Sequence, residues 1–388
     1  MLKYLFGVLL TGSFHLLVWW RLVKPAHLPK RAHRAITIAM IVLWMSIPLT
    51  TTARLWAPGF ASAASWITMP WMALIGLMTI AMIALELSRL VARAGRRAIG
   101  RREDEAQGDL MSRRKFLARV GSGAAVTAAS TSVARGMIEA RGEHEVVDVE
   151  VRLAKLPKAL DGFSIVQLSD LHVGLTIDRG FVQRVVDHAN RLSPDLIALT
   201  GDLVDGPVAE LADEIAPLAN LRAKHGVYAV TGNHEYYAGA DPWIAAIKKL
   251  NVTYLRNRLV TIGDGAAAFD LAGVDDHGAY KYSGHGEDLK AATANRDPSR
   301  ALVLLAHQPR QVRRAAKHGV DLQLSGHTHG GQIWPWHYIV KVQQGGLLAG
   351  RYEYEGTQLY VTRGCGYWGP PVRLLAPLEI TRVILRSA

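Results

Sequence analysis

Five apolar runs of strand length in the second half of this chain each end in a side chain that could hold a metal ion. Such runs predict buried strands. The carboxyl ends of strands in an open α/β sheet gather the functional side chains at one edge. We therefore expect distant residues to converge there. The candidate residues are Asp170, His172, Asp202, Asn233, His307, His327 and His329.

Helical patterns alternate with these runs, which is typical of a layered α/β fold. The runs are Phe163–Ser169, Leu196–Thr200, Val227–Thr231, Leu302–Ala306 and Asp321–Ser325. The helical patterns cover Arg179–Leu192, Leu211–Lys224, Trp243–Leu250 and Gln311–Lys317. Late β runs follow at Gln358–Thr362 and Leu378–Ile384.

The donor set contains carboxylate, imidazole and one amide, and it lacks thiolate. Oxygen and nitrogen donors suit divalent ions such as Mn²⁺, Zn²⁺ and Fe. A pair of such ions is a known device for displacement at phosphorus. If Asp170 and Asp202 are the only anionic ligands, two divalent ions keep a charge of roughly +2, which attracts an anionic phosphate. A neutral Asn233 ligand preserves that charge.

The motifs Asp170-Leu-His, Gly201-Asp, Gly232-Asn-His-Glu, His307 and Gly326-His-Thr-His occur in order along the chain. This pattern resembles the calcineurin-like metallophosphoesterase family, from about Val146 to about Leu385. The resemblance implies an α/β fold, a four-layer sandwich of two mixed β-sheets flanked by helices.

The same resemblance implies a role for each motif residue. Asp170, His172 and His329 would hold one metal, Asn233, His307 and His327 the other, and Asp202 would bridge both. A water activated between the metals would attack phosphorus, and His234 would contact the phosphate or protonate the leaving oxygen. Asp205 and Glu235 would orient the groups that touch the metals.

The segment Gly326–Gln332 together with Arg363-Gly364 resembles a membrane-associated bacterial branch of the family. That branch includes phosphodiesterases similar to UDP-2,3-diacylglucosamine hydrolase. Arg363 would reach a substrate phosphate, although a structural salt bridge fits equally well. Trp334 and Trp336 would form an apolar wall for a lipid chain or dip into a membrane, and packing in a core or interface is the alternative.

Other reactive side chains lack this motif context. Asp275 and Asp276 are expected in a polar loop, and the single cysteine, Cys365, is expected as a small buried residue. Five histidines are expected on the surface or in loops: His188, His225, His277, His285 and His337.

Charge divides the chain near residue 145. Residues 1–145 contain 19 Lys and Arg against 8 Asp and Glu, whereas residues 146–388 contain 26 against 25. The catalytic part is therefore nearly neutral. A protein that grips a long nucleic-acid backbone needs a basic surface on its own domain, so we expect no nucleic-acid partner.

Three apolar stretches, Tyr4–Trp20, Ala35–Ala53 and Ser65–Leu85, precede the catalytic part. Their lengths are near the roughly 20 residues that cross a bilayer as a helix, and the alternative is a soluble bundle of buried helices. Basic residues crowd the segments Arg21–Arg34 and Arg89–Arg102. The positive-inside rule therefore places both segments in the cytoplasm.

The string Ser112-Arg-Arg-Lys-Phe-Leu resembles a twin-arginine export signal, and a weakly apolar stretch follows at Val120–Ala134. Ser132-Val-Ala would precede a cleavage site, or the segment would remain as a fourth span. Arg135–Glu145 is expected as a short charged linker. Such a signal places the catalytic part outside the cytoplasm.

The sequence thus predicts a transmembrane region (1–110), a signal or anchor with linker (111–145) and a metallophosphoesterase domain (146–388). We expect a multi-pass protein of the bacterial cytoplasmic membrane that hydrolyses phosphodiester or pyrophosphate bonds of a lipid-linked or other small substrate. UDP-2,3-diacylglucosamine lies on the cytoplasmic side, so either the signal is inactive or the substrate is another envelope phosphodiester. The alternatives are an extracytoplasmic nucleotide phosphatase and a non-catalytic membrane scaffold. The oligomeric state stays open.

Overall fold

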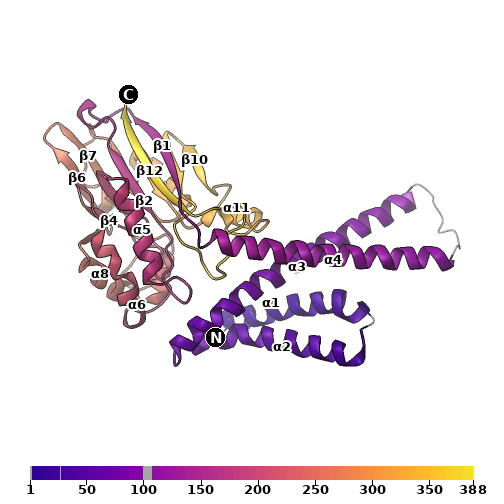
Figure 1. Ribbon diagram of the computed structural model, residues 1–388. Coiled ribbons are helices and arrows are strands. Elements are labelled where there is room, and N and C mark those ends of the chain that lie inside the picture. Colours follow the sequence, from indigo (N-terminus) through magenta and orange to yellow (C-terminus); the bar gives the residue numbers. More distant parts are fainter. Residues whose placement is uncertain (1, 27, 99–106) are drawn as a thin grey trace. The chain divides into compact units, whose positions relative to one another are not determined.

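The computed structural model describes residues 2–26, 28–98 and 107–388, with the side chains of residues 2–4, 96–97 and 107–119 outside the description. The chain forms two compact units. One contains residues 1–137 with 369–372, and the other contains residues 138–368 with 373–388. Figure 1 shows a helical region and a region built on β-sheets.

The first unit is all-helical, as predicted. Its helices are α1 (Leu2–Val18), α2 (Lys30–Ala53), α3 (Pro58–Ala98) and α4 (Gln107–Glu139). A π-helical turn, Trp19–Val23, and a 3₁₀ turn, Lys24–Ala26, extend α1. Within the described residues, three helical segments are long and apolar enough to cross a membrane: Leu5–Ala26, Lys30–Ala53 and Pro58–Gly95.

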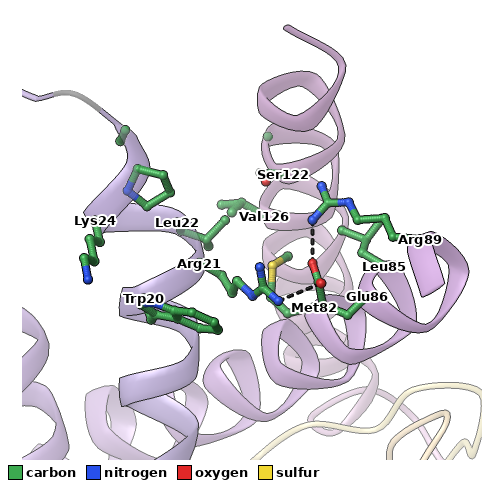
Figure 2. A pocket seen from close by; sticks show the side chains of 13 residues that line it. Trp20, Arg21, Leu22, Lys24, Met82, Leu85, Glu86, Arg89, Ser122 and Val126 are labelled. Carbon is green, nitrogen blue, oxygen red and sulfur yellow. Dashed lines mark hydrogen bonds and ion pairs between the residues drawn. The ribbon is translucent and has the colours of Figure 1, made fainter. Parts of the chain in front are cut away.

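Large apolar side chains cover the outside of these helices. Leu9, Val42 and Ile67 are more than half exposed, whereas Met40, Ile75 and Ala129 are buried in the inner cluster that α1, α2, α3 and α4 share. A helix that is apolar all round needs either a protein interior or lipid around it. Figure 2 shows the charged exception, where Arg21 and Arg89 flank Glu86.

Two helices extend beyond the segments expected from the sequence. Helix α3 has 41 residues and contains the apolar stretch Ser65–Leu85, because its apolar part continues into a polar helix that an apolar window does not detect. Helix α4 continues to Glu139, so the first residues of the expected linker, Arg135–Glu139, are helical. The backbone of the twin-arginine-like string lies in α4, but its side chains lie outside the described part.

The second unit contains two six-stranded mixed sheets. The first sheet has the order β1-β12-β2-β3-β4-β5, and the second has the order β10-β11-β9-β8-β7-β6. The strands of the first are β1 (Glu145–Leu153), β12 (Glu379–Ser387), β2 (Ser164–Leu168), β3 (Leu196–Leu199), β4 (Val227–Ala229) and β5 (Val252–Tyr254). Those of the second are β10 (Gly350–Tyr354), β11 (Thr357–Val361), β9 (Leu322–Ser325), β8 (Leu302–Leu305), β7 (Ala267–Gly273) and β6 (Arg258–Asp264).

Alternating side chains of the central strands build three apolar layers. In β3, Leu196 points into the cluster between the sheets, and Ile197 points into the cluster under the helices. In β8, Val303 joins the same inner cluster, and Leu304 joins a third cluster on the opposite face. Successive strand residues face opposite sides of a sheet, so continuous apolar runs produce sheets buried on both faces. The four-layer α/β prediction is confirmed.

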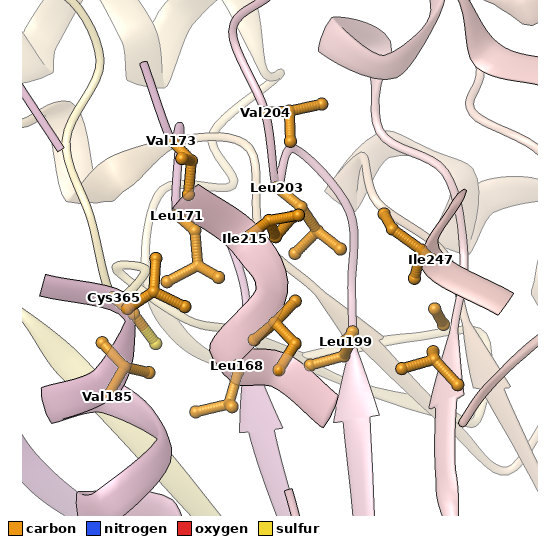
Figure 3. Packing of buried hydrophobic residues seen from close by; sticks show 14 of the residues in the cluster. Leu168, Leu171, Val173, Val185, Leu199, Leu203, Val204, Ile215, Ile247 and Cys365 are labelled. Atoms are coloured by element: carbon orange, nitrogen blue, oxygen red, sulfur yellow. The ribbon is translucent and has the colours of Figure 1, made fainter. Parts of the chain in front are cut away.

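Helices cover the outer faces of both sheets. Figure 3 shows Val185, Ile215 and Ile247 against Leu168 and Leu199 of the first sheet. The helices on that side are α5 (Arg179–Arg191), α6 (Val208–Ile215), α7 (Asn233–Ala238) and α8 (Ala240–Lys248). The second sheet is accompanied by α9 (Leu289–Thr293), α10 (Val312–Ala315) and α11 (His337–Gln343).

The second helical pattern was partly wrong. A helix was expected over Leu211–Lys224, but α6 ends at Ile215 and a 3₁₀ turn, Ala216–Asn220, follows. Pro217 causes this change, because a proline has no N–H for the next helical hydrogen bond.

Candidate metal centre

The seven predicted ligands lie just beyond the carboxyl ends of five strands from both sheets. Asp170 follows β2, Asp202 follows β3 and Asn233 begins α7 after β4. His307 follows β8, and His327 follows β9. The parallel pairing of β2, β3 and β4, and of β8 with β9, brings these ends to common edges.

Six of these residues form two groups whose ligand atoms lie within 4.8 Å of one another. One group contains Asp170, His172 and His329, and the other contains Asp202, His307 and His327. The family resemblance assigns the first group to one metal. It assigns His307 and His327 of the second group to the other metal and Asp202 to the bridge between them. The assignment of each residue as a ligand stays a prediction.

Short distances occur within each group and between the two groups. His172 Nε2 lies 3.0 Å from His329 Nε2, and His307 Nε2 lies 3.2 Å from His327 Nδ1. Asp202 Oδ2 lies 3.1 Å from His307 Nε2 and 3.8 Å from His172 Nε2. Asp202 therefore reaches both groups, as a bridging carboxylate would.

The backbone at the site is strained. Asp170, His172, Asp202, His327 and His329 all have φ between 52° and 73°, in the left-handed region that non-glycine residues seldom occupy. Such conformations persist only where the surroundings enforce them, and they cluster at functional sites. Five of the seven candidate ligands thus share a conformation that turns each chain segment sharply at the end of its strand.

Glycines let the loops approach one another. A Cβ atom at Gly232 would collide with the Asp202 carboxylate, and one at Gly326 would collide with Ser169 and the Asp170 carboxylate. Only glycine fits this close approach. The backbone N–H of His234 consequently donates to Asp202 Oδ1 at 2.8 Å, and that of His327 donates to the Asp170 carboxylate at 3.0 Å.

Two of the imidazoles are neutral. Burial lowers the pKa of His327 to about 3, assisted by the nearby His307. Burial and the neighbouring His172 and Arg373 hold the pKa of His329 well below its usual range. A histidine must be neutral to ligate a metal, and burial favours the neutral form of both rings.

The site also attracts positive charge. Burial opposes ionisation of Asp202, but the surrounding imidazoles, His307 foremost, hold its pKa well below the usual range. His307 Nδ1–H donates to the Thr200 carbonyl at 2.8 Å. That bond leaves Nε2 facing the Asp202 carboxylate at 3.1 Å. Either the Nε2 proton or a bound cation can lie between these two atoms.

The side chain of Asn233 independently indicates a cation site. Its Oδ1 atom is buried and has no hydrogen-bond partner among the described residues. A buried acceptor without a partner costs roughly 1–3 kcal/mol. A divalent cation bound by carboxylate, imidazole and amide donors would satisfy this oxygen, so the residues present fit the metals that the fold family implies.

Asp205 connects a candidate ligand to the candidate acid. Its Oδ1 atom accepts from His172 Nδ1 and from His234 Nδ1, both at 2.7 Å. The first bond directs His172 Nε2 toward the metal-ligand cluster. Burial opposes a charge on His234, but Asp202 and Asp205 outweigh burial and raise its pKa to about 9.

Glu235 fixes the backbone of two ligand loops. Its carboxylate accepts from the N–H groups of Asp202 at 3.0 Å, Leu203 at 2.7 Å and Gly232 at 2.7 Å. It is fully buried. The carboxylate therefore holds the loop after β3 against the loop after β4.

Arg373 is a site residue that the sequence analysis missed. It is fully buried, and its guanidinium donates to the carbonyls of His329, Gly366 and Ala376. Its Nη2 atom also lies 3.2 Å from His329 Nδ1. Arg373 thus fixes the loop behind one candidate ligand. Its partners are mostly backbone carbonyls. Every residue type has a backbone carbonyl, so these contacts produce no recognisable sequence motif.

Arg363 lies outside the ligand cluster. Its Nε donates to Glu379 at 2.6 Å, and its Nη2 donates to Glu145 at 2.8 Å. These ion pairs match the structural alternative considered for this residue.

Aromatic side chains surround His234. The ring of Tyr237 lies 5.1 Å from that of His234, and the ring of Trp368 lies 5.9 Å from it. Trp334 and Trp336 are each about half exposed, at 46% and 47%. The sequence analysis missed Tyr237 and Trp368, because their proximity depends on how the loops close.

The remaining side chains stay apart from the two ligand groups. Asp275 and Asp276 lie in a loop after β7, as predicted, but both are buried. Asp275 pairs with Arg256 at 2.7 Å, and Asp276 accepts from Gln308 at 2.9 Å. Cys365 is buried, as predicted, and burial raises its pKa to about 12.

Comparisons with known proteins agree with this geometry. Residues 163–331 match the family described as calcineurin-like phosphoesterase. A metallophosphoesterase of Helicobacter pylori is 40% identical over 248 residues, which cover 63% of this chain and 65% of that protein. The aligned part thus spans slightly less than two thirds of this relative.

Two further relatives are covered more completely. A bovine transmembrane protein with a metallophosphoesterase domain is 40% identical over 299 residues, covering 74% of this chain and 67% of that protein. The metallophosphoesterase YkuE of Bacillus subtilis is 32% identical over 290 residues, covering 71% of this chain and 98% of that protein. By these similarities, the chain belongs to the calcineurin-like metallophosphoesterase family.

Proposed function

We propose that this protein is a membrane-anchored, metal-dependent hydrolase of phosphodiester or pyrophosphate bonds, with residues 146–388 as its catalytic domain. One observation carries the proposal. Two groups of imidazole and carboxylate donors lie on either side of Asp202, next to a buried amide oxygen without a partner. Two divalent ions bound there would supply Lewis acidity and would lower the pKa of an attacking water.

Each side chain has a distinct task in this proposal. Asp170, His172 and His329 would hold one ion, while His307, His327 and Asn233 would hold the second, and Asp202 would contact both. His234, oriented by the hydrogen bond from its Nδ1 to Asp205, would carry a proton on Nε2 and would donate it to the leaving oxygen. Burial opposes a charge on His234, but Asp202 and Asp205 raise its pKa to about 9 in the metal-free site, which favours a protonated ring at neutral pH.

Exposed apolar side chains near the end of β9 favour a substrate with a lipid part. Trp334 and Trp336 lead into α11, which has no buried residue and exposes Ile339 and Val342. Contiguous exposed apolar surface on a protein marks an interaction site. We therefore propose a lipid-linked phosphoester of the UDP-2,3-diacylglucosamine type or another envelope phosphodiester.

For the location, we propose a multi-pass protein of the bacterial cytoplasmic membrane with its catalytic domain outside. The support is the excess of Lys and Arg in the segments 21–34 and 89–102 and the twin-arginine-like string at 112–117.

The first prediction concerns the bridging carboxylate. Replacing Asp202 by Ala should remove at least one of two bound ions and reduce hydrolysis of bis(p-nitrophenyl) phosphate to background, because this side chain reaches both donor groups. Elemental analysis and turnover of the purified full-length chain measure both effects. Asp213→Ala, at an exposed carboxylate of α6, is the control. Unchanged turnover in Asp202→Ala would exclude a bridging role.

The second prediction concerns His234. His234→Ala should keep both metals but lower kcat by a factor of roughly 10²–10⁴, the range of general acid catalysis. The loss should be larger for an alkyl leaving group than for p-nitrophenolate, which departs without a proton. His188→Ala, in α5, is the matched control. An equal loss with both leaving groups would contradict proton donation by His234.

The third prediction concerns the apolar surface. Trp334→Ala should raise KM for a diacyl-lipid phosphodiester in mixed micelles by about tenfold, the effect of roughly 1.4 kcal/mol of lost contact, while KM for a soluble diester stays constant. Tyr280→Ala, which removes another exposed aromatic side chain, is the control. Equal changes for both substrates would refute a lipid-binding wall.

The fourth prediction concerns orientation. A β-lactamase fused after Ala388 should protect cells against ampicillin, because the carboxyl terminus would lie outside the cytoplasm. Replacing Arg113 and Arg114 together by Lys should abolish that protection while the fusion protein is still made. Full protection without the arginine pair would show that the twin-arginine-like string is not used.

A further inference from the structure

A charged cavity lies inside the helical unit, apart from the metal centre. It has a volume of about 800 Å³ and is lined by the two turns that follow α1, by α3 and by α4. Figure 2 shows Arg21, Glu86 and Arg89 at its wall, with Leu22, Leu85 and Val126 beside them. The cavity therefore combines a polar end with apolar sides.

The charges in the cavity leave a positive excess. Glu86 pairs with Arg21 at 2.6 Å and with Arg89 at 2.5 Å. Lys24 also lines the cavity, and the described part of the chain offers it no ion-pair partner. Three cationic side chains thus face one carboxylate, for a net charge of +2.

One donor of Arg21 is unused. Its Nε–H is buried, and no acceptor for it is found among the residues that the structure describes. The Arg21 guanidinium is held in place by Glu86 and by Trp20, whose ring centre lies 4.4 Å from Arg21 Cζ. A buried donor without an acceptor is costly, and a phosphate oxygen is a strong acceptor for arginine.

The π-helical turn after α1 and the small residues of α4 leave room for the cavity. Trp19–Val23 is a π-helical turn, a rare conformation that occurs mostly at functional sites. Across the cavity, α4 contributes Ser122 and Gly123, and small side chains leave room between helices.

The basic residues of the cavity lie near the ends of the candidate membrane spans, where lipid headgroups would be found. Arg21 and Lys24 lie near the end of the segment Leu5–Ala26, and Arg89 lies near the end of Pro58–Gly95. Tryptophan, arginine and lysine at such ends are typical of the membrane interface. Basic pockets between membrane helices bind anionic lipid headgroups.

We propose that this cavity binds one anionic glycerophospholipid. Its phosphate accepts from Arg21 Nε and from Lys24, and one acyl chain lies along Met82, Leu85 and Val126. The positive excess selects an anionic over a zwitterionic lipid. The site is separate from the substrate site of the proposed hydrolase, and it holds the lipid without chemical change.

The test measures binding of phosphatidylglycerol and phosphatidylcholine to the full-length chain in detergent by native mass spectrometry. One phosphatidylglycerol should bind at least about tenfold more tightly than phosphatidylcholine. Lys24→Gln should weaken phosphatidylglycerol binding about fivefold, which corresponds to about 1 kcal/mol for one basic residue near the membrane. No carboxylate partner of Lys24 is found among the described residues, so this variant spares the Glu86 ion pairs.

Two further variants make the result decisive. Arg31→Gln removes the same charge from an exposed residue outside the cavity and should change binding less than twofold. Ser122→Trp fills the cavity without changing charge and should abolish specific binding. Equal weakening by Arg31→Gln, equal binding of the two lipids, or unchanged binding in Ser122→Trp would overturn the proposal. Competition by inorganic phosphate at the lipid's own concentration would also overturn it, since the site would then recognise a free anion.

Discussion

The candidate metal centre depends on holding several metal-binding side chains close together in a buried place. His172 and His329 have ring nitrogens 3.0 Å apart, and an Asp202 oxygen lies 3.1 Å from His307 Nε2. Burial removes the water that would screen these groups. The surrounding fold supplies the opposing constraint through left-handed ligand residues, glycines that allow close backbone approach, and Glu235, which binds three N–H groups. Such a site is organised for positive charge.

The sequence predicted the parts of this arrangement that depend on local pattern. Apolar runs such as Leu196–Thr200 predicted strands buried on both faces, and the residues at their ends marked the edge where the structure brings six candidate ligands together. Family membership and the four-layer fold are confirmed, whereas the individual ligand roles stay predictions. Arg373 could not be predicted, because it binds carbonyls of loops whose path depends on the complete fold.

The helical unit shows a different limit of sequence reasoning. Apolar windows located three helices correctly but missed the polar continuation of α3 and the helical start of the expected linker. Membrane-length segments are recognised by hydropathy, whereas helix ends are decided by capping and packing. The cavity at Arg21 and Glu86 could not be predicted from the sequence either, because its lining residues come from three separate helical segments.

The shared carboxylate of Asp205 has a thermodynamic consequence. Its Oδ1 atom accepts from Nδ1 of His172, which faces the ligand cluster, and from Nδ1 of His234, the candidate proton donor. Cations bound in the cluster would repel the charge on His234 and would lower the pKa of its ring. Linkage is reciprocal, so a more acidic medium would in turn weaken ion binding. Metal binding by the candidate centre and protonation of His234 would thus be coupled equilibria.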